Sequence, residues 1–384
     1  MSLPRIPFGF VCHLVNGKAF KPTDWSGAGV PIIRIQNLNG SDKPFNYWAG
    51  TLDKQILVKT GDLLLAWSGT PGTSFGAHIW NGPKGILNQH IFRCDLDQKA
   101  ITKEWARIAV NHRLDRLIEQ AHGGVGLQHV TRGMVEELEI PLPPLPEQRR
   151  IAGVLDLAEA LRTLRRAALA QLDSLTQSLF LDLFGDDTTI LDQWPTRRLG
   201  DLLDFLTSGS RGWAEYYSDS GDLFLRIQNV RRDELILADA AYVRAPNTAE
   251  AKRTRVQAGD VLLSITADLG RTAVVPDGLG PAYINQHLSI LRTKGIVPRF
   301  LSAYFNSPVG KRQVSRRNRQ AVKAGLNFDD IRSFVIPIPP IGLQREFERR
   351  VRAVDKLRTM QRASLAEMDA LFASLQHRAF RGEL

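Results

Sequence analysis

The sequence contains an internal repeat, and this repeat limits the possible folds more than any other feature of the chain. The stretch Ile140-Pro141-Leu142-Pro143-Pro144 returns as Ile336-Pro337-Ile338-Pro339-Pro340, 196 positions further on. Aligned without a gap, residues 140–184 and 336–380 are identical at 18 of 45 positions. The chain is therefore expected to contain two copies of one structural unit.

Each copy of the repeat predicts a long helix that begins just after the proline-rich stretch. Proline lacks the backbone N–H and restricts the residue before it, whereas Pro146 and Glu147 suit the first turn of a helix. Apolar residues then recur at steps of three, four and seven, as in a coiled coil. The residues expected to pack helix against helix are Val154, Ala158, Leu161, Leu172, Leu175 and Leu179, with Val351, Val354, Leu357, Met368, Leu371 and Leu375.

One helix cannot bury such a stripe by itself. We therefore expect the two helices to pack on each other as an antiparallel coiled coil, the alternative being a helix packed on its own globular domain. Short apolar runs such as 31–35 and 86–92 predict strands, and 103–121 and 298–317 predict helices. The expected fold is α+β: two globular domains in pseudo-repeat, separated by two long helices. The expected boundaries are 1–145, 146–185, 186–341 and 342–384.

The charge balance favours a polyanionic partner. The chain has 50 Lys and Arg against 40 Asp and Glu, a net charge of +10, and its pI is about 9.8. The excess is +3, 0, +4 and +3 over the four expected segments, so no basic tail is present. This distribution fits globular surfaces that contact a phosphate backbone, although a merely soluble basic protein would also show it. Two cysteines and the lack of a long apolar run indicate a cytoplasmic protein without a membrane span.

Motifs for catalysis are missing from the sequence. There is no phosphate-binding G-x-x-x-x-G-K-[ST] loop, no dinucleotide motif, no metal-ligand spacing and no Asn/Asp-Pro-Pro-aromatic motif of an amino-methyltransferase. Acid-x-Lys triplets, which some nucleases use, occur at Asp97/Lys99 and Glu250/Lys252, but such triplets also arise by chance. We therefore expect neither enzymatic activity nor a bound cofactor or metal.

The chain resembles the specificity (S, or HsdS) subunits of type I restriction-modification systems. The resemblance lies in Ile-Pro-Leu-Pro-Pro-Leu-Pro-Glu-Gln-Arg-Arg (140–150), Ile-Pro-Ile-Pro-Pro-Ile-Gly-Leu-Gln-Arg (336–345), Leu-Phe-Gly-Asp (183–186) and Ala-Phe-Arg-Gly-Glu-Leu (379–384). It covers the whole chain. One departure is Gly342-Leu343, which stands where the first copy has Pro146-Glu147.

The resemblance implies a non-catalytic subunit in which two target-recognition domains each read one half of a bipartite double-stranded DNA target. It also implies that the helices set the spacing of the half-sites and dock two methyltransferase (M) subunits, with restriction (R) subunits in the full complex. Methyl donor, ATP and metal would belong to those partners. Two alternatives stay open: a coiled-coil scaffold that does not read DNA sequence, and a nuclease.

Side chains able to recognise bases occur in motifs shared by both copies. Arg and Gln can contact base edges in the major groove, and alternate residues of a strand share a face. Arg34 and Gln36, with Arg226 and Gln228, are therefore candidates, as is Gln89. These motifs, Arg-Ile-Gln-Asn and Asn-Gln-His, can equally recur because they shape the fold.

Loops that differ between the copies are stronger candidates, because domains that read different half-sites should differ where they touch bases. The predicted base-reading residues are Ser68, Thr70, Ser74, Gln128, His129 and Arg132 in the first domain, and Ser210, Arg211, Asp268 and Arg271 in the second. Phosphate contacts are predicted for the basic run Arg316, Arg317, Arg319 and Lys323. A solvated helix end is the alternative for this run.

Overall fold

The computed structural model describes residues 3–38, 43–69, 75–120, 128–186, 189–231, 233–317 and 325–384. It divides into two compact units, of which unit 1 comprises Met1–Leu164 with Leu365–Leu384, and unit 2 comprises Arg165–Ser364. Each unit contains one globular α+β domain together with parts of two long helices.

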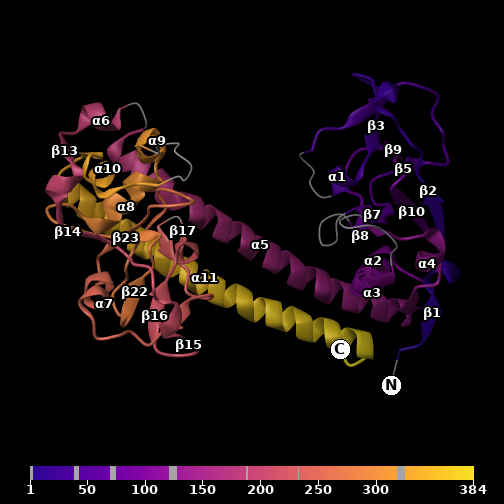
Figure 1. Cartoon of the computed structure of the whole chain (residues 1–384). Coiled ribbons are helices and arrows are strands. Elements are labelled where there is room, and N and C mark those ends of the chain that lie inside the picture. The colour runs from indigo at the N-terminus through magenta and orange to yellow at the C-terminus, as the bar shows by residue number, and fades with distance from the viewer. Residues whose placement is uncertain are drawn as a thin grey trace. The chain divides into compact units, whose positions relative to one another are not determined.

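The two long helices are the largest elements of the chain (Figure 1). Helix α5 (Leu145–Phe184) begins in unit 1 and ends in unit 2, whereas α11 (Ile341–Arg381) begins in unit 2 and ends in unit 1. Helix α5 stops at Gly185, which has a φ of 95° that glycine adopts without strain.

The domain of unit 1 contains two four-stranded sheets, ordered β2-β10-β6-β8 and β4-β3-β9-β5, and two short strand pairs, β1-β12 and β11-β7. Its strands are β1 (Arg5–Pro7), β2 (Cys12–Asn16), β3 (Val30–Ile33), β4 (Asn46–Trp48), β5 (Leu57–Val58), β6 (Leu63–Ala66), β7 (Ser68–Gly69), β8 (Gly76–Ile79), β9 (Gly85–Leu87), β10 (Ile91–Leu96), β11 (Gln128–His129) and β12 (Glu139–Pro141). Its helices are α1 (Ile35–Leu38), α2 (Lys103–His112), α3 (Leu114–Gln120) and α4 (Arg132–Glu136).

The domain of unit 2 has a similar arrangement, with four-stranded sheets ordered β14-β23-β20-β21 and β15-β19-β16-β22 and the pair β13-β24, which corresponds to β1-β12. Its second short pair, β17-β18, is a local hairpin and does not correspond to β11-β7. Its strands are β13 (Thr196–Arg198), β14 (Leu203–Ser208), β15 (Tyr217–Ser218), β16 (Asp222–Leu225), β17 (Val230–Arg231), β18 (Glu234–Leu235), β19 (Ala241–Val243), β20 (Val261–Ser264), β21 (Thr272–Val274), β22 (Ala282–Ile284), β23 (Leu288–Thr293) and β24 (Val335–Pro337). Its helices are α6 (Ile190–Gln193), α7 (Ala249–Thr254), α8 (Pro298–Asn306), α9 (Pro308–Arg317) and α10 (Phe328–Arg332).

The predicted α+β pseudo-repeat is confirmed, and some element boundaries are corrected. The run 86–92 forms two strands, β9 and β10, because a turn at 88–90 interrupts it. The segment 298–317 forms two helices, because α8 ends before Ser307, and Pro308, the first residue of α9, has no N–H with which to continue the hydrogen bonds of α8. No helix in the described part of the chain is long and apolar enough to cross a membrane.

A repeated glutamine attaches each domain to the start of its long helix. The Gln148 side chain is fully buried, accepts a hydrogen bond from the N–H of Thr102 (2.8 Å) and donates to the carbonyls of Ala100 and Pro143. In unit 2, Gln344 makes the corresponding bond with the N–H of Val297 (2.9 Å). The glutamine of the repeat therefore joins the first turn of the long helix to the segment that precedes α2 or α8.

The long helices run antiparallel in both units. In unit 1, Arg150 contacts Leu384 and Arg162 contacts Asp369. In unit 2, Arg165 contacts Gln361, and the Phe184 and Phe347 rings lie 5.5 Å apart. Residue numbers rise along α5 as they fall along α11, so the predicted antiparallel packing is confirmed within each unit.

The predicted packing positions are correct for only part of the helices. Val351 and Val354 are buried, and Val154, Ala158, Leu172, Leu179, Met368 and Leu375 are partly buried. The prediction is wrong for Leu161, Leu175, Leu357 and Leu371, which are 38–58% exposed. In each case the next residue along the helix is less exposed than the leucine. These residues are Arg162, Thr176, Arg358 and Phe372. The packing seam therefore contains charged side chains, which a search for apolar residues cannot find.

Candidate nucleic-acid interface

The repeated Arg-Ile-Gln-Asn motif forms the same turn in both domains. The side chain of Asn229 accepts a hydrogen bond from the N–H of Arg226 (2.8 Å) and donates to the carbonyl of Ile236 (2.8 Å). Asn37 makes the corresponding bond with the N–H of Arg34 (3.0 Å). Both asparagines are buried. The motif therefore recurs in part because its asparagine holds the backbone of this turn.

The predicted strand face for this motif is wrong. Gln36 lies in α1, after the end of β3, because the asparagine turns the chain into a short helical segment. Arg34 donates to Asn46 (3.0 Å), and Arg226 donates to a backbone carbonyl. Gln36 and Gln228 are exposed. Base contacts from these four residues stay a prediction.

The Asn-Gln-His motif occupies the turn between β9 and β10 in unit 1 and between β22 and β23 in unit 2. Gln89 is exposed, and its amide nitrogen lies 3.0 Å from Nε2 of His90. In unit 2, His287 Nδ1 lies 2.5 Å from the hydroxyl of Thr266. The motif thus stabilises a turn in each domain, and Gln89 is its exposed member in unit 1.

Residues of two predicted loops meet in unit 1. Strand β7 pairs with β11, which places Ser68 opposite His129 and Gly69 opposite Gln128. Ser68 is buried, and Arg132 follows on α4, where it forms an exposed ion pair with Glu136 (2.7 Å). Thr70 and Ser74 lie outside the described residues.

The corresponding place in unit 2 is the turn between β20 and β21, where Thr266 bridges to Gly325. Arg271, a predicted base contact, lies in this turn and pairs with Asp268, whose Oδ2 is 2.6 Å from the arginine Nε. Both side chains are partly exposed.

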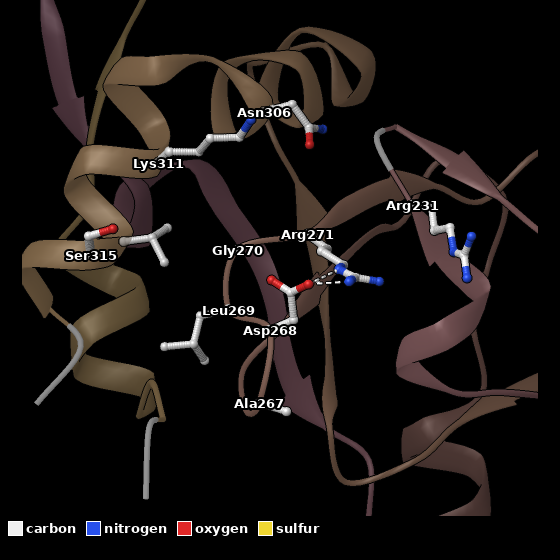
Figure 2. Close-up of a pocket in the computed structure, with 10 residues that line it drawn as sticks. Arg231, Ala267, Asp268, Leu269, Gly270, Arg271, Asn306, Lys311 and Ser315 are labelled. Carbon is white, nitrogen blue, oxygen red and sulfur yellow. Dashed lines mark hydrogen bonds and ion pairs between the residues drawn. The ribbon is translucent and has the colours of Figure 1, made fainter. Parts of the chain in front are cut away.

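This turn forms one wall of a cleft of about 950 Å³ within unit 2. Figure 2 shows the Asp268–Arg271 pair between Lys311 and Ser315 of α9 on one side and Arg231 of β17 on the other. Sequence reasoning found Asp268 and Arg271 but missed Lys311 and Arg231. The signal for Lys311 was available, because it lies five residues before Arg316 on the same helix, α9, where the predicted basic run begins.

The basic run itself is only partly described. Arg316 is exposed, whereas Arg317 is held by two hydrogen bonds to Ser333 (2.8 Å each) and lies over the Phe334 ring at 4.6 Å. Arg317 therefore anchors α9 to the domain. Arg319 and Lys323 lie outside the described residues.

The other predicted residues of unit 2 lie at a second, smaller cavity of about 260 Å³. Ser210 accepts a hydrogen bond from Nε1 of Trp213 (3.2 Å), and Arg211 is exposed beside it. The structure does not bring this pair to the cleft of Arg271.

Unit 1 contains a cavity of about 860 Å³ that sequence reasoning did not find. Its lining includes His78, Trp80 and Asn111, together with Arg107, which forms an ion pair with Asp156 of α5. Burial lowers the pKa of His78, with a smaller contribution from the charge of Arg107, so this ring is neutral at pH 7.

The described residues contain no group of His, Cys, Asp and Glu that could hold a metal ion. The acid-x-Lys triplets of the nuclease alternative show ordinary local structure. Asp97 accepts a hydrogen bond from the N–H of Lys99 (3.0 Å) in a turn, and Glu250 and Lys252 lie on α7.

The structure defines a class of protein in which one α+β domain occurs twice and is joined by two paired long helices. The family model of the type I restriction modification DNA specificity domain matches residues 8–173 and again residues 192–367. The chain therefore belongs to this family, with one matched domain in each half.

Known proteins resemble the chain over most of its length. It is 25% identical to the specificity subunit of the type I restriction enzyme EcoBI from Escherichia coli, over 99% of this chain and 86% of that protein. It is 21% identical to the MjaVIII specificity subunit from Methanocaldococcus jannaschii, over 86% and 81%. The crystal structure of the S subunit from M. genitalium matches with a TM-score of 0.65 at 16% identity, over 99% of this chain and 96% of that chain.

Proposed function

We propose that the chain is the DNA sequence-specificity subunit of a type I restriction-modification complex. Each globular domain recognises one half of a bipartite target in double-stranded DNA. The observation that most supports this is that one domain fold occurs twice and that the family model matches both copies. The basic cleft of unit 2 adds a surface suited to a phosphate backbone.

Each of the four expected segments has a separate task in this function. Residues 1–145 and 186–341 are the recognition domains, and 146–185 and 342–384 are the helices that set the spacing and dock partners. The subunit is not itself an enzyme, and the methyl donor, ATP and metal are bound by other subunits. It acts in the cytoplasm with two methyltransferase subunits, and with restriction subunits in the full complex.

Exposed leucines support partner docking on α5. Leu157, Leu161 and Leu164 are 46–67% exposed and lie on one face of the helix, at spacings of four and three. Apolar side chains gathered on one face of a helix are typical of surfaces that another protein covers.

The experiment is methylation mapping of DNA from cells that express the chain with its cognate methyltransferase subunit. The expected result is methylation of one bipartite motif, and exchange of residues 1–145 for those of another specificity subunit should change one half only. Changes in both halves, or in neither, would show that the domains do not read independently. DNA binding that depends on salt but prefers no sequence would instead favour the scaffold alternative.

A further inference from the structure

The turn between β20 and β21 is held by hydrogen bonds to the buried side chain of Ser264. The fully buried Ser264 hydroxyl accepts from the N–H of Arg271 (2.8 Å) and donates to the carbonyl of Asp268 (2.5 Å). Gly270 has a φ of 83° and packs against Val314 of α9, where an added Cβ would come within 3.0 Å. The position of the turn relative to α9 is therefore defined before any ligand binds.

The turn presents two complementary side chains to the cleft. The guanidinium of Arg271 reaches Oδ2 of Asp268 through Nε (2.6 Å) and Nη2, as Figure 2 shows. Both contacts use the same carboxylate oxygen and the same side of the guanidinium. The ion pair restrains the guanidinium of Arg271 before DNA binds, which reduces the entropy lost on binding. It also places the N–H donors of Arg271 beside the carboxylate acceptor of Asp268.

The remaining walls of the cleft supply positive charge. Lys311 and Ser315 come from one face of α9, and Arg231 comes from β17. With Asp268 and Arg271, the charged lining consists of three cations and one anion. Neither Lys311 nor Arg231 forms an ion pair with another residue that the structure describes. Two such cations beside a restrained Arg–Asp pair fit a DNA strand, because phosphates need charge whereas a base edge needs oriented donors and acceptors.

We propose that this cleft binds DNA, with Asp268 and Arg271 recognising a G·C base pair and Lys311 and Arg231 contacting phosphates. Arginine donates to O6 and N7 of guanine in the major groove, and a carboxylate accepts from the N4 amino group of cytosine. This inference rests on the proposed function and deepens it, since it assigns a base pair to particular residues of the second domain.

The test uses the full chain assembled with its methyltransferase subunits and duplexes of the methylated motif, each altered at one position. The half-site of the second domain is the one that changes when residues 186–341 are exchanged. We expect Arg271→Gln to reduce discrimination at one G·C position of that half by about 10- to 100-fold, with all other positions unchanged. Arg271→Lys should lose the same discrimination, because an ammonium group lacks the fork.

Lys311→Ala should behave differently. It should weaken binding to all duplexes alike and reduce the slope of log affinity against log salt by about 1. The matched control is Arg332→Ala, which also removes an arginine paired with an aspartate three positions before it, Asp329, but at a site that does not line the cleft. It should leave discrimination at every position unchanged.

The possible outcomes distinguish a failure of base recognition by Arg271 from a failure of the proposed function. If the wild-type complex methylates no bipartite motif, the proposed function fails. If a motif exists but that half-site has no G·C pair, or Arg271→Gln discriminates as the wild type does, only the present inference fails. An equal loss of affinity for all duplexes would make Arg271 a phosphate contact, which also overturns base recognition.

Discussion

Asp233 is a buried carboxylate at a point where unit 2 contacts its long helix. It follows β17 with a φ of 71°, a left-handed conformation that Asp and Asn tolerate better than most residues. Arg299 of α8 donates to Oδ2 of Asp233 (3.2 Å) and also to Asp355 of α11 (2.9 Å). Burial raises the pKa of Asp233 to about 6, although the charge of Arg299 acts in the opposite direction.

The raised pKa predicts that Asp233 makes unit 2 less stable as pH rises. Between pH 4 and 6 the folded state holds the proton while the unfolded state has released it, so each increase in pH reduces the free energy of unfolding. The total effect is up to about 3 kcal/mol and is complete above pH 6.

Asp233→Asn removes the charge and keeps a residue suited to the backbone. Relative to this variant, the wild type should lose stability from pH 4 to 6 in urea unfolding. Parallel pH profiles would contradict the prediction.

Single residues also show what a sequence can and cannot predict. Gln148, Gln344, Asn37 and Asn229 all belong to repeated motifs, and all are buried with hydrogen bonds to the backbone. The repeat thus located positions that hold the fold, which are the same in both domains. The cleft is harder to predict, because Arg231, Arg271 and Lys311 are brought together only by tertiary structure.

Among the elements, the helix pair has an unusual seam. Arg162 reaches Asp369 in unit 1 (2.6 Å), and Arg358 reaches Asp173 in unit 2 (3.0 Å). Arg358 is the repeat counterpart of Arg162, and Asp369 is that of Asp173, each 196 positions further on. The arginine therefore comes from α5 in the first pair and from α11 in the second. The apolar period correctly predicted that the two helices pack, but it placed the contacts at Leu161 and Leu357, one residue before Arg162 and Arg358. Arginine can occupy such positions because its long side chain covers apolar surface and still reaches a carboxylate.

At the middle of the seam, Arg165 contacts Gln361, and these two positions also differ by 196. Gln361→Arg would place two guanidinium groups in contact, which should destabilise the helix pair by about 1–2 kcal/mol through like-charge repulsion. Adding Arg165→Gln restores an Arg–Gln pair with the partners exchanged and should recover most of the loss. Urea unfolding of the two single variants and the double variant measures the coupling. Additive effects would show that these side chains do not interact.

The whole molecule consists of two recognition domains that share two continuous helices. Family membership and domain duplication were predictable from the repeat, since it spans the proline-rich stretch and the long helix in both halves. The DNA bases recognised were not predictable, because the loops differ between the copies and no general code relates loop sequence to bases. The proposed spacing role of the helices rests on their continuity, since each begins in one unit and ends in the other.

Removing one heptad from the middle of each long helix, residues 162–168 and 358–364, keeps the remaining packing positions in phase because they repeat every seven residues. It also removes Arg162, Arg165, Arg358 and Gln361, so the shortened helices pair without these seam contacts. Each helix becomes about 10 Å shorter at 1.5 Å per residue. If the helices set the spacing, the gap between the methylated half-sites should shorten by about 3 base pairs at 3.4 Å each, while both half-sites stay the same. Insertion of one heptad in each helix is the matched variant and should lengthen the gap equally. An assembled complex that methylates at the original gap after either change would show that something other than helix length determines the spacing.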